Sequence, residues 1–96
     1  MRMPACRLGD FCTGHRCYPP RPSVEGSPDV FTNNRPQHRV TDKWGVHCCG
    51  LSCHDSELVS GSKTVLINGL GAARVGDPVA CGSKVMTGSH NVIIGD

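Results

Sequence analysis

The chain has 96 residues, of which 38% are hydrophobic and 4% aromatic, with seven cysteines and a net charge of +2 at pH 7. This length fits one small domain with a thin core, so we expect metal or disulfides to supplement its packing. The weak charge, with no basic stripe interleaved with aromatic residues, argues against nucleic-acid binding, and no apolar run reaches the length of a membrane span.

The N-terminal residues 1–6 contain no apolar run that could serve as a signal peptide, which predicts synthesis in the cytoplasm. In that reducing compartment an odd number of cysteines favours metal ligands and small buried residues over a disulfide framework. We expect four of the seven cysteines to be buried or inert, namely Cys6, Cys12, Cys17 and Cys49.

Two short phrases each occur three times in step, which predicts internal threefold repetition. The first is found as Pro4-Ala5-Cys6-Arg7-Leu8-Gly9-Asp10, Pro36-Gln37-His38-Arg39-Val40-Thr41-Asp42 and Gly71-Ala72-Ala73-Arg74-Val75-Gly76-Asp77. The second begins with Gly-Ser at residues 26, 61 and 88, and the first two of these glycines precede Arg39 and Arg74 by thirteen residues. The Asp that closes each arginine phrase is predicted to accept backbone hydrogen bonds in a tight turn.

Each repeat is predicted to be a β-hairpin followed by a variable loop, with no helix. Val65–Ile67 is a β-type run, and Asn68-Gly69 behind it favours a type I′ turn, as does Asn33-Asn34 in the preceding copy. The last strand, Val92–Ile94, is expected to pair with Ala5–Leu8, which would join the ends of the chain and close three hairpins around an axis. Closure removes the free strand edges.

A metal ligand follows each closing aspartate at nearly the same distance. His15 and His47 each lie five residues after an Asp, and Cys81 lies four residues after another, so threefold symmetry would bring them together. Zinc needs a fourth ligand, and we favour His54, seven residues past His47 in the longest loop, with Cys48 and Cys53 as alternatives. The resulting site is a closed structural zinc set of His15, His47, His54 and Cys81.

The remaining histidines and the tryptophan are assigned structural or surface roles. His38 and His90 are expected at the surface, and Trp44 is expected to pack under the long second loop.

These phrases resemble the PAAR-repeat proteins, which are named after Pro-Ala-Ala-Arg. The resemblance covers residues 1–96 as a single domain and implies an all-β cone with a broad base, whose apex holds Zn²⁺ through three histidines and one cysteine, the composition of the set above. This chain departs from the family pattern at Thr41, where glycine is usual, and at Gln37-His38 and Arg16-Cys17.

The resemblance also implies a function and partners. Members cap the trimeric β-helical spike of a contractile injection machine, either a VgrG-like trimer of a type VI secretion system or the central spike of a phage tail, with one cap per trimer. The implied role is mechanical puncture of a target membrane, with no catalysis and no small-molecule substrate. The protein would travel on the spike through the target envelope, as a secreted protein or a virion component. No effector domain follows Asp96, so we expect a bare tip.

Two alternatives belong to other functional classes. A small zinc-dependent hydrolase would need an open zinc position and a general base such as Asp55 or Glu57, and the four-ligand count argues against it. A zinc-ribbon-like binding module would need paired Cys-x-x-Cys knuckles, a spacing that Cys48, Cys49 and Cys53 lack.

Overall fold

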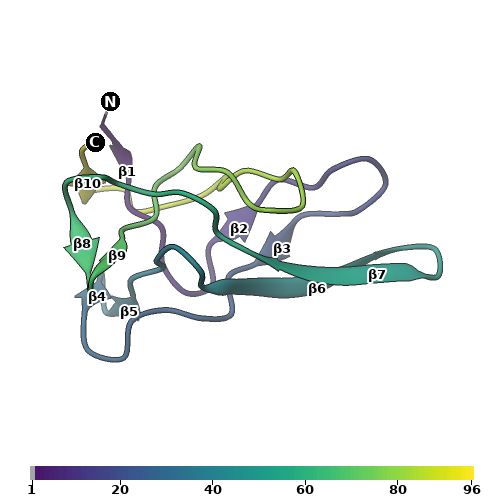
Figure 1. The fold of residues 1–96 in the computed structure, drawn as a ribbon, viewed down its shortest axis with the longest axis horizontal. Coiled ribbons are helices and arrows are strands. Elements are labelled where there is room, and N and C mark those ends of the chain that lie inside the picture. The colour runs from purple at the N-terminus through teal and green to yellow at the C-terminus, as the bar shows by residue number, and fades with distance from the viewer. Residues whose placement is uncertain (1) are drawn as a thin grey trace.

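The computed structural model describes residues 2–96 as an elongated all-β molecule with extents of 38 × 26 × 23 Å along its principal axes (Figure 1). Among these residues no helix is long and apolar enough to cross a membrane. Most strands are short because turns rich in Gly, Pro and Asn interrupt the chain every few residues. In chain order they are β1 (Met3–Pro4), β2 (Phe11–Cys12), β3 (Arg21–Pro22), β4 (Phe31–Thr32), β5 (Arg35–Pro36), β6 (Lys43–Cys49), β7 (Ser52–Glu57), β8 (Leu66–Ile67), β9 (Leu70–Gly71) and β10 (Ile93–Ile94).

Two hairpins, β4–β5 and β8–β9, form where the sequence predicted them. Their turn residues are Asn33-Asn34, with φ of 53° and 65°, and Asn68-Gly69, with φ of 55° and 80°. Positive φ at both central positions is what a type I′ turn requires, and asparagine and glycine reach it at low cost. The sequence prediction of both turns is confirmed.

A third strand pair joins the two ends of the chain, as predicted, but in a different register. β1 pairs with β10 so that Pro4 faces Ile93, whereas the sequence analysis placed the return strand at Ala5–Leu8. Ala5 still donates its N–H to the Val92 carbonyl at 2.9 Å. The residues after Ala5 pair instead with the other two copies, because their backbone groups are used around the central axis.

The central axis is closed by a ring of backbone hydrogen bonds between equivalent residues of the three copies. Cys6 donates its N–H to the Ala73 carbonyl, Ala73 donates to His38, and His38 donates to Cys6, each at 3.0 Å. A cyclic pattern of this kind is what a pseudo-threefold axis requires, so the repetition seen in the sequence is a symmetry of the fold.

Each arginine phrase forms the same tight turn. The closing carboxylate accepts the arginine backbone N–H at 2.8–2.9 Å and the guanidinium Nε–H at 2.8–3.1 Å, in the pairs Arg7–Asp10, Arg39–Asp42 and Arg74–Asp77. Thr41 occupies the position of Gly9 and Gly76 and shares their positive φ, at 77° against 88° and 94°. A β-branched residue is disfavoured there, so the turn is maintained in the second copy at a conformational cost.

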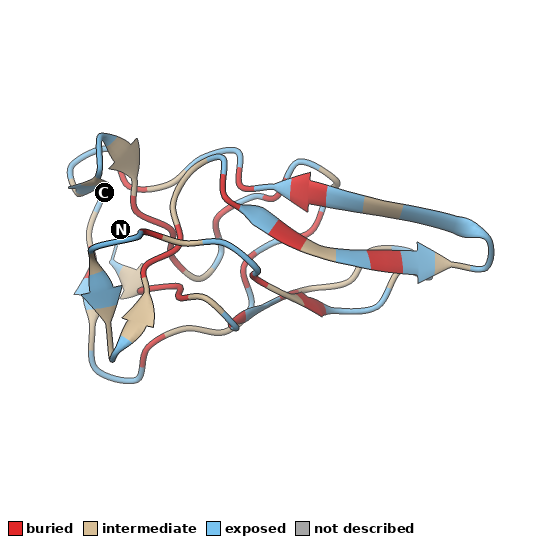
Figure 2. Cartoon of the chain, turned by 90° about the horizontal axis from the view of Figure 1, so that it is seen from below, coloured by how far each residue is buried: buried red, intermediate tan, exposed pale blue. Residues whose placement is uncertain are grey.

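The segment that follows Asp42 was predicted to be a loop, and it is instead a hairpin of two strands. β6 and β7 are the longest strands of residues 2–96 and project away from the other hairpins (Figure 1). Gly50 and Leu51 form the turn between them, and Gly50 takes a φ of 64°. The register pairs His47 with His54 and Cys48 with Cys53, with an irregularity between Trp44 and His47. Figure 2 shows isolated buried positions along this hairpin, separated by intermediate and exposed ones.

The main core lies between the symmetric hairpins and the start of β6, and it consists of Cys6, Cys12, Trp44, Leu58, Ala73, Val79 and Val85. The predicted burial of Cys6 and Cys12 is confirmed. Trp44 is 1% exposed and lies within β6 itself, inside the core. His38 was predicted at the surface and is fully buried, because it stands at the axis position of Cys6 and Ala73 and packs on the Trp44 ring with centroids 4.6 Å apart. His90 is exposed, as predicted.

Burial lowers the pKa of the His38 imidazole below its ordinary value. The Nδ1–H donates to the Glu25 carbonyl at 2.9 Å, and this bond opposes the shift, as do the carboxylates of Asp42 and Glu25, whereas Arg39 adds to it. Nε2 of His38 has no hydrogen-bond partner among residues 2–96. A proton at Nε2 would therefore be buried without an acceptor.

We expect His38 to make the fold less stable in acid. Because its folded pKa lies below the unfolded value of about 6.5, the unfolded chain takes up the proton first as pH falls, and stability is lost by up to about 1.4 kcal/mol per pH unit until the folded pKa is passed. Urea unfolding at pH 7.5 and 5.5 should show a smaller acid-induced loss in His38→Ala than in the wild type. His90→Ala is the control and should keep the wild-type loss; equal losses in all three proteins would contradict the expectation.

Candidate metal centre

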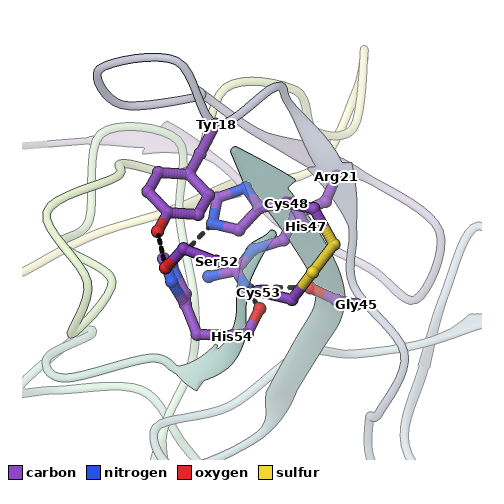
Figure 3. Close-up of a disulfide and its surroundings, with 8 residues drawn as sticks. All are labelled: Tyr18, Arg21, Gly45, His47, Cys48, Ser52, Cys53 and His54. Carbon is purple, nitrogen blue, oxygen red and sulfur yellow. Dashed lines mark hydrogen bonds between the residues drawn. A yellow bond between two sulfur atoms is a disulfide. The ribbon is translucent and has the colours of Figure 1, made fainter. Parts of the chain in front are cut away.

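The four predicted ligands come together at one place, with their ligand atoms all within 4.8 Å of one another. His47 lies on β6 and His54 faces it on β7, with the two Nε2 atoms 2.8 Å apart (Figure 3). Nε2 of His15 lies 3.2 Å from Nε2 of His54. Cys81 has a free thiol and supplies the sulfur. The cluster is thus assembled from three separate segments, each of which follows a closing aspartate.

The tautomer of His47 is determined by its backbone partner. The Pro19 carbonyl lies 2.8 Å from Nδ1 of His47, and because a carbonyl can only accept, Nδ1 carries the proton. Nε2 of the neutral ring therefore presents a lone pair toward the other histidines. An imidazole oriented by a carbonyl on its far nitrogen is the usual arrangement of a metal ligand.

The electrostatics of the cluster favour neutral imidazoles. Desolvation lowers the pKa of the His15 imidazole, and the neighbouring His47 and His54 lower it further. Desolvation, His47 and Arg21 likewise lower the pKa of the His54 imidazole. Because a metal ion binds the neutral imidazole, these lowered pKa values keep the ring nitrogens available at neutral pH.

The cysteine is in an environment that stabilises a thiolate. Burial on its own would raise the pKa of the Cys81 thiol, but hydrogen bonds with Ser83 and the charge of Arg21 lower it below its ordinary value. Nη2 of Arg21 donates to Sγ of Cys81 at 3.1 Å. A tetrahedral ion with imidazole nitrogens at about 2.0–2.1 Å would hold two of them about 3.3 Å apart, close to the separations found here. The donor set can therefore hold a metal ion.

Tyr18 covers the imidazole cluster. Its ring centroid lies 4.8 Å from that of His15, 4.9 Å from that of His47 and 4.4 Å from that of His54. Its hydroxyl is 2.7 Å from Oγ of Ser52 on β7, which ties residues 13–20 to the hairpin (Figure 3). The aromatic cover limits the access of water to the ligand nitrogens.

Two disulfides surround the cluster, which corrects the prediction that the cysteines avoid disulfides. Cys17 is bonded to Cys49, with Cα atoms 5.4 Å apart, and Cys48 to Cys53, with Cα atoms 4.1 Å apart. The prediction rested on the redox compartment and not on geometry, and the β6–β7 register places Cys48 directly opposite Cys53. Cys48 and Cys53, the two alternatives for the fourth ligand, are bonded to each other, whereas Cys81 is free.

Three features of this centre were not predicted from the sequence: Tyr18, Arg21 and the disulfide pairing. Gly50-Leu51 as a two-residue hairpin turn would have placed Cys48 and Cys53 opposite each other. Arg21 lies five residues before the Gly-Ser phrase, and the other two copies have Ser56 and Ser83 at this position. An arginine where the other repeats have serine was the sequence signal that could have singled out Arg21. No comparable signal marks Tyr18.

Fold and site together define a small pseudo-threefold β protein whose three copies bring one ligand cluster to a common point. Residues 13–87 match the family model described as the PAAR motif. Because this match covers more than half of the chain, the protein belongs to the PAAR motif family.

Relatives with curated names are much longer toxins. The chain is 36% identical over 78 residues to the NAD(P)(+) glycohydrolase toxin Tse6 of Pseudomonas aeruginosa PAO1, and equally to the (p)ppApp synthetase toxin Tas1 of Pseudomonas aeruginosa UCBPP-PA14. Each alignment covers 75% of this chain and 18% of the toxin. The double-stranded DNA deaminase toxin A of Burkholderia cenocepacia H111 is 37% identical over 70 residues, or 71% of this chain and 5% of the toxin. The chain thus matches less than a fifth of the length of these relatives.

Proposed function

We propose that this chain is a spike-tip protein that caps the trimeric β-helical spike of a contractile injection machine, of the type VI secretion or phage-tail kind, and sharpens it for membrane puncture. Residues 1–96 would act as one PAAR-repeat domain with a mechanical role and no catalytic one. The observation that carries this proposal is a threefold-equivalent set of exposed apolar side chains on the hairpins.

The apolar set lies at the same position in each copy. Phe31, Leu66 and Ile93 are 57%, 59% and 46% exposed, and they face Pro36, Gly71 and Pro4 across their hairpins. Figure 1 places these hairpins at one end of the molecule, opposite the tip of β6–β7. We call this end the hairpin face. A single chain that repeats an apolar contact three times around an axis is suited to a partner with true threefold symmetry.

The hairpin face also has the backbone chemistry to end a β-helical spike. A trimeric β-helix ends in three unpaired strand edges, and the short outer strands of this face can cover them by backbone pairing. A second equivalent set of exposed residues, Val24, Val59 and Met86, shows that apolar exposure follows the repeat beyond the hairpins themselves. The partner we propose is therefore a VgrG-like trimer or a phage central spike, with one cap per trimer.

We further propose that the cluster holds structural Zn²⁺ through His15, His47, His54 and Cys81. Three imidazoles and one thiolate form a closed tetrahedral set, and zinc is the ion that such sets most commonly bind. A closed site leaves no position for substrate, which favours the mechanical role over hydrolysis. Bound zinc, together with the disulfides, would stiffen the end of the molecule that is opposite the hairpin face.

The proposed localisation is on the spike and, after contraction, beyond the envelope of the producing cell. The disulfides support this, because such bonds persist in oxidising compartments and are rare in the cytosol. The names of the relatives support it as well, since a segment shared by toxins of different chemistry is suited to a role in delivery.

The test is the stoichiometry of the complex. The chain is mixed with candidate spike trimers, and the mass of the complex is measured by native mass spectrometry. One cap per three spike chains is the expected result. Three caps per trimer, or no complex with any candidate, would contradict the proposal.

A further inference from the structure

Arg21 on β3 is a buried cation that has no carboxylate partner among the residues that the structure describes. Its residue is 2% exposed, and within residues 2–96 it forms no ion pair with a carboxylate. A buried guanidinium without a counter-charge is strongly destabilising. Sγ of Cys81, 3.1 Å from Nη2, is the group that can supply the opposite charge when it is a thiolate.

The second terminal nitrogen of the guanidinium, Nη1, holds the β6–β7 hairpin, which carries His47 and His54 and is called the histidine hairpin below. Nη1 of Arg21 donates to the carbonyl of Gly45 on β6 at 2.9 Å and to that of His54 on β7 at 3.3 Å (Figure 3). The planar fork of arginine can bind groups on two sides at a fixed separation. Arg21 therefore ties the cysteine ligand to the strands that carry two of the histidine ligands.

The position of Arg21 in the repeat explains why it reaches the sulfur. Arg21, Ser56 and Ser83 each lie five residues before a Gly-Ser phrase, and all three are buried. Oγ of Ser83 lies 3.5 Å from Sγ of Cys81. Two residues at this repeat position, Arg21 and Ser83, therefore contact the thiol directly. The first copy has the long charged side chain of arginine where the other two copies have serine.

We propose that Arg21 is the positioning residue of the metal centre. This inference rests on the proposed metal site. Arg21 neutralises and orients the Cys81 thiolate and sets its distance from the histidine hairpin, so that the four ligands are arranged before the ion binds. It does not itself bind the ion.

The experiment uses Co²⁺ as a spectroscopic probe of the purified full chain with its disulfides intact. Co²⁺ is titrated into the wild type, Arg21→Met and Arg21→Lys, and the thiolate-to-cobalt charge-transfer band is recorded. Arg35→Met is the matched control, because Arg35 is a partly buried arginine on β5, in a hairpin that carries none of the four ligands. The near-ultraviolet circular dichroism of Trp44 reports whether each variant is folded.

We expect Arg21→Met to bind Co²⁺ 10–100-fold more weakly than the wild type, as for the loss of other groups that orient metal ligands. Loss of the donor leaves the sulfur richer in electrons, so the charge-transfer band should move to lower energy. Arg21→Lys should bind with intermediate affinity, because an ammonium cannot hold the sulfur and both carbonyls together. Arg35→Met should match the wild type.

The outcomes separate this inference from the proposed site. A wild type that binds no Co²⁺ would overturn both. A wild type that binds Co²⁺ through sulfur, with unchanged affinity and band energy in Arg21→Met, would overturn the role of Arg21 alone. If Arg21→Met does not fold, Arg21→Lys decides: wild-type affinity in that variant would show that the fork is not needed.

Discussion

Removing the metal from the reduced protein is expected to unfold the end of the molecule formed by residues 13–20 and the β6–β7 hairpin. The proposed ligands come from three segments, and His15 and Cys81 lie far from His47 and His54 in the sequence. Structural zinc contributes on the order of 10–16 kcal/mol to folding in small peptides, whereas a whole domain is typically stable by about 5–15 kcal/mol.

The disulfides determine how strongly metal removal destabilises this end of the molecule. Cys17–Cys49 closes a segment of 32 residues and Cys48–Cys53 one of 5, which correspond to about 4 and 2 kcal/mol in the chain-entropy model. With both bonds intact, residues 13–20 stay attached to β6 after the metal leaves. Chelation should therefore lower the melting temperature moderately in the oxidised protein and strongly in the reduced one.

The measurement is thermal unfolding with and without a strong chelator, in oxidised and reduced samples, with hydrogen exchange to locate the loss of protection. His47→Ala should reproduce the effect of chelation, and His90→Ala, which removes an exposed histidine, should not. A reduced protein whose melting curve does not respond to the chelator would refute the structural role of the metal.

Replacing the three apolar side chains of the hairpin face is expected to weaken binding to the spike strongly. Fully burying a large apolar side chain contributes about 1.5–3 kcal/mol, and about half of this remains for side chains that are 46–59% exposed in the free protein. The triple variant Phe31→Ser, Leu66→Ser, Ile93→Ser should therefore bind about 50- to 2,000-fold more weakly. Its own stability should change little, because these side chains are already exposed in the free protein. Binding is measured by titration of the spike trimer.

The control removes apolar side chains that are more exposed and lie elsewhere on the molecule. Val46 and Leu51 are 65% and 105% exposed on the β6–β7 hairpin, away from the hairpin face. The double variant Val46→Ser, Leu51→Ser should bind the spike as the wild type does. If this variant loses binding and the triple variant keeps it, the spike is bound at the opposite end of the molecule.

Local sequence was enough to predict the β4–β5 and β8–β9 hairpins and the convergence of His15, His47 and Cys81. Asn68-Gly69 favours a type I′ turn in any surroundings, because asparagine and glycine reach positive φ at low cost. His15 and His47 lie at the same distance in sequence from Asp10 and Asp42. Residues at the same distance from equivalent aspartates occupy equivalent places around the threefold axis, so this spacing was enough to predict that the two histidines meet. The repeated phrases thus contained both the architecture and the meeting point of the ligands.

Other features depended on contacts between distant residues. His38 has the sequence context of a surface residue in a polar phrase, but the ring of hydrogen bonds with Cys6 and Ala73 places it on the axis. Cys17 meets Cys49 because residues 13–20 fold over β6, and neither spacing nor composition specifies that approach.

The order of residues alone accounts for the threefold repeat, the all-β hairpins and the convergence of His15, His47 and Cys81, because turns and repeat spacings are local properties. The sequence left the fourth residue open between His54, Cys48 and Cys53, and the Cys48–Cys53 disulfide leaves His54 as the candidate. Three-dimensional packing accounts for the burial of His38, the pairing of the cysteines and the place of Arg21 against the Cys81 sulfur. These features depend on which chain segments lie side by side after the ring of three copies closes. That closure joins residues from opposite ends of the sequence.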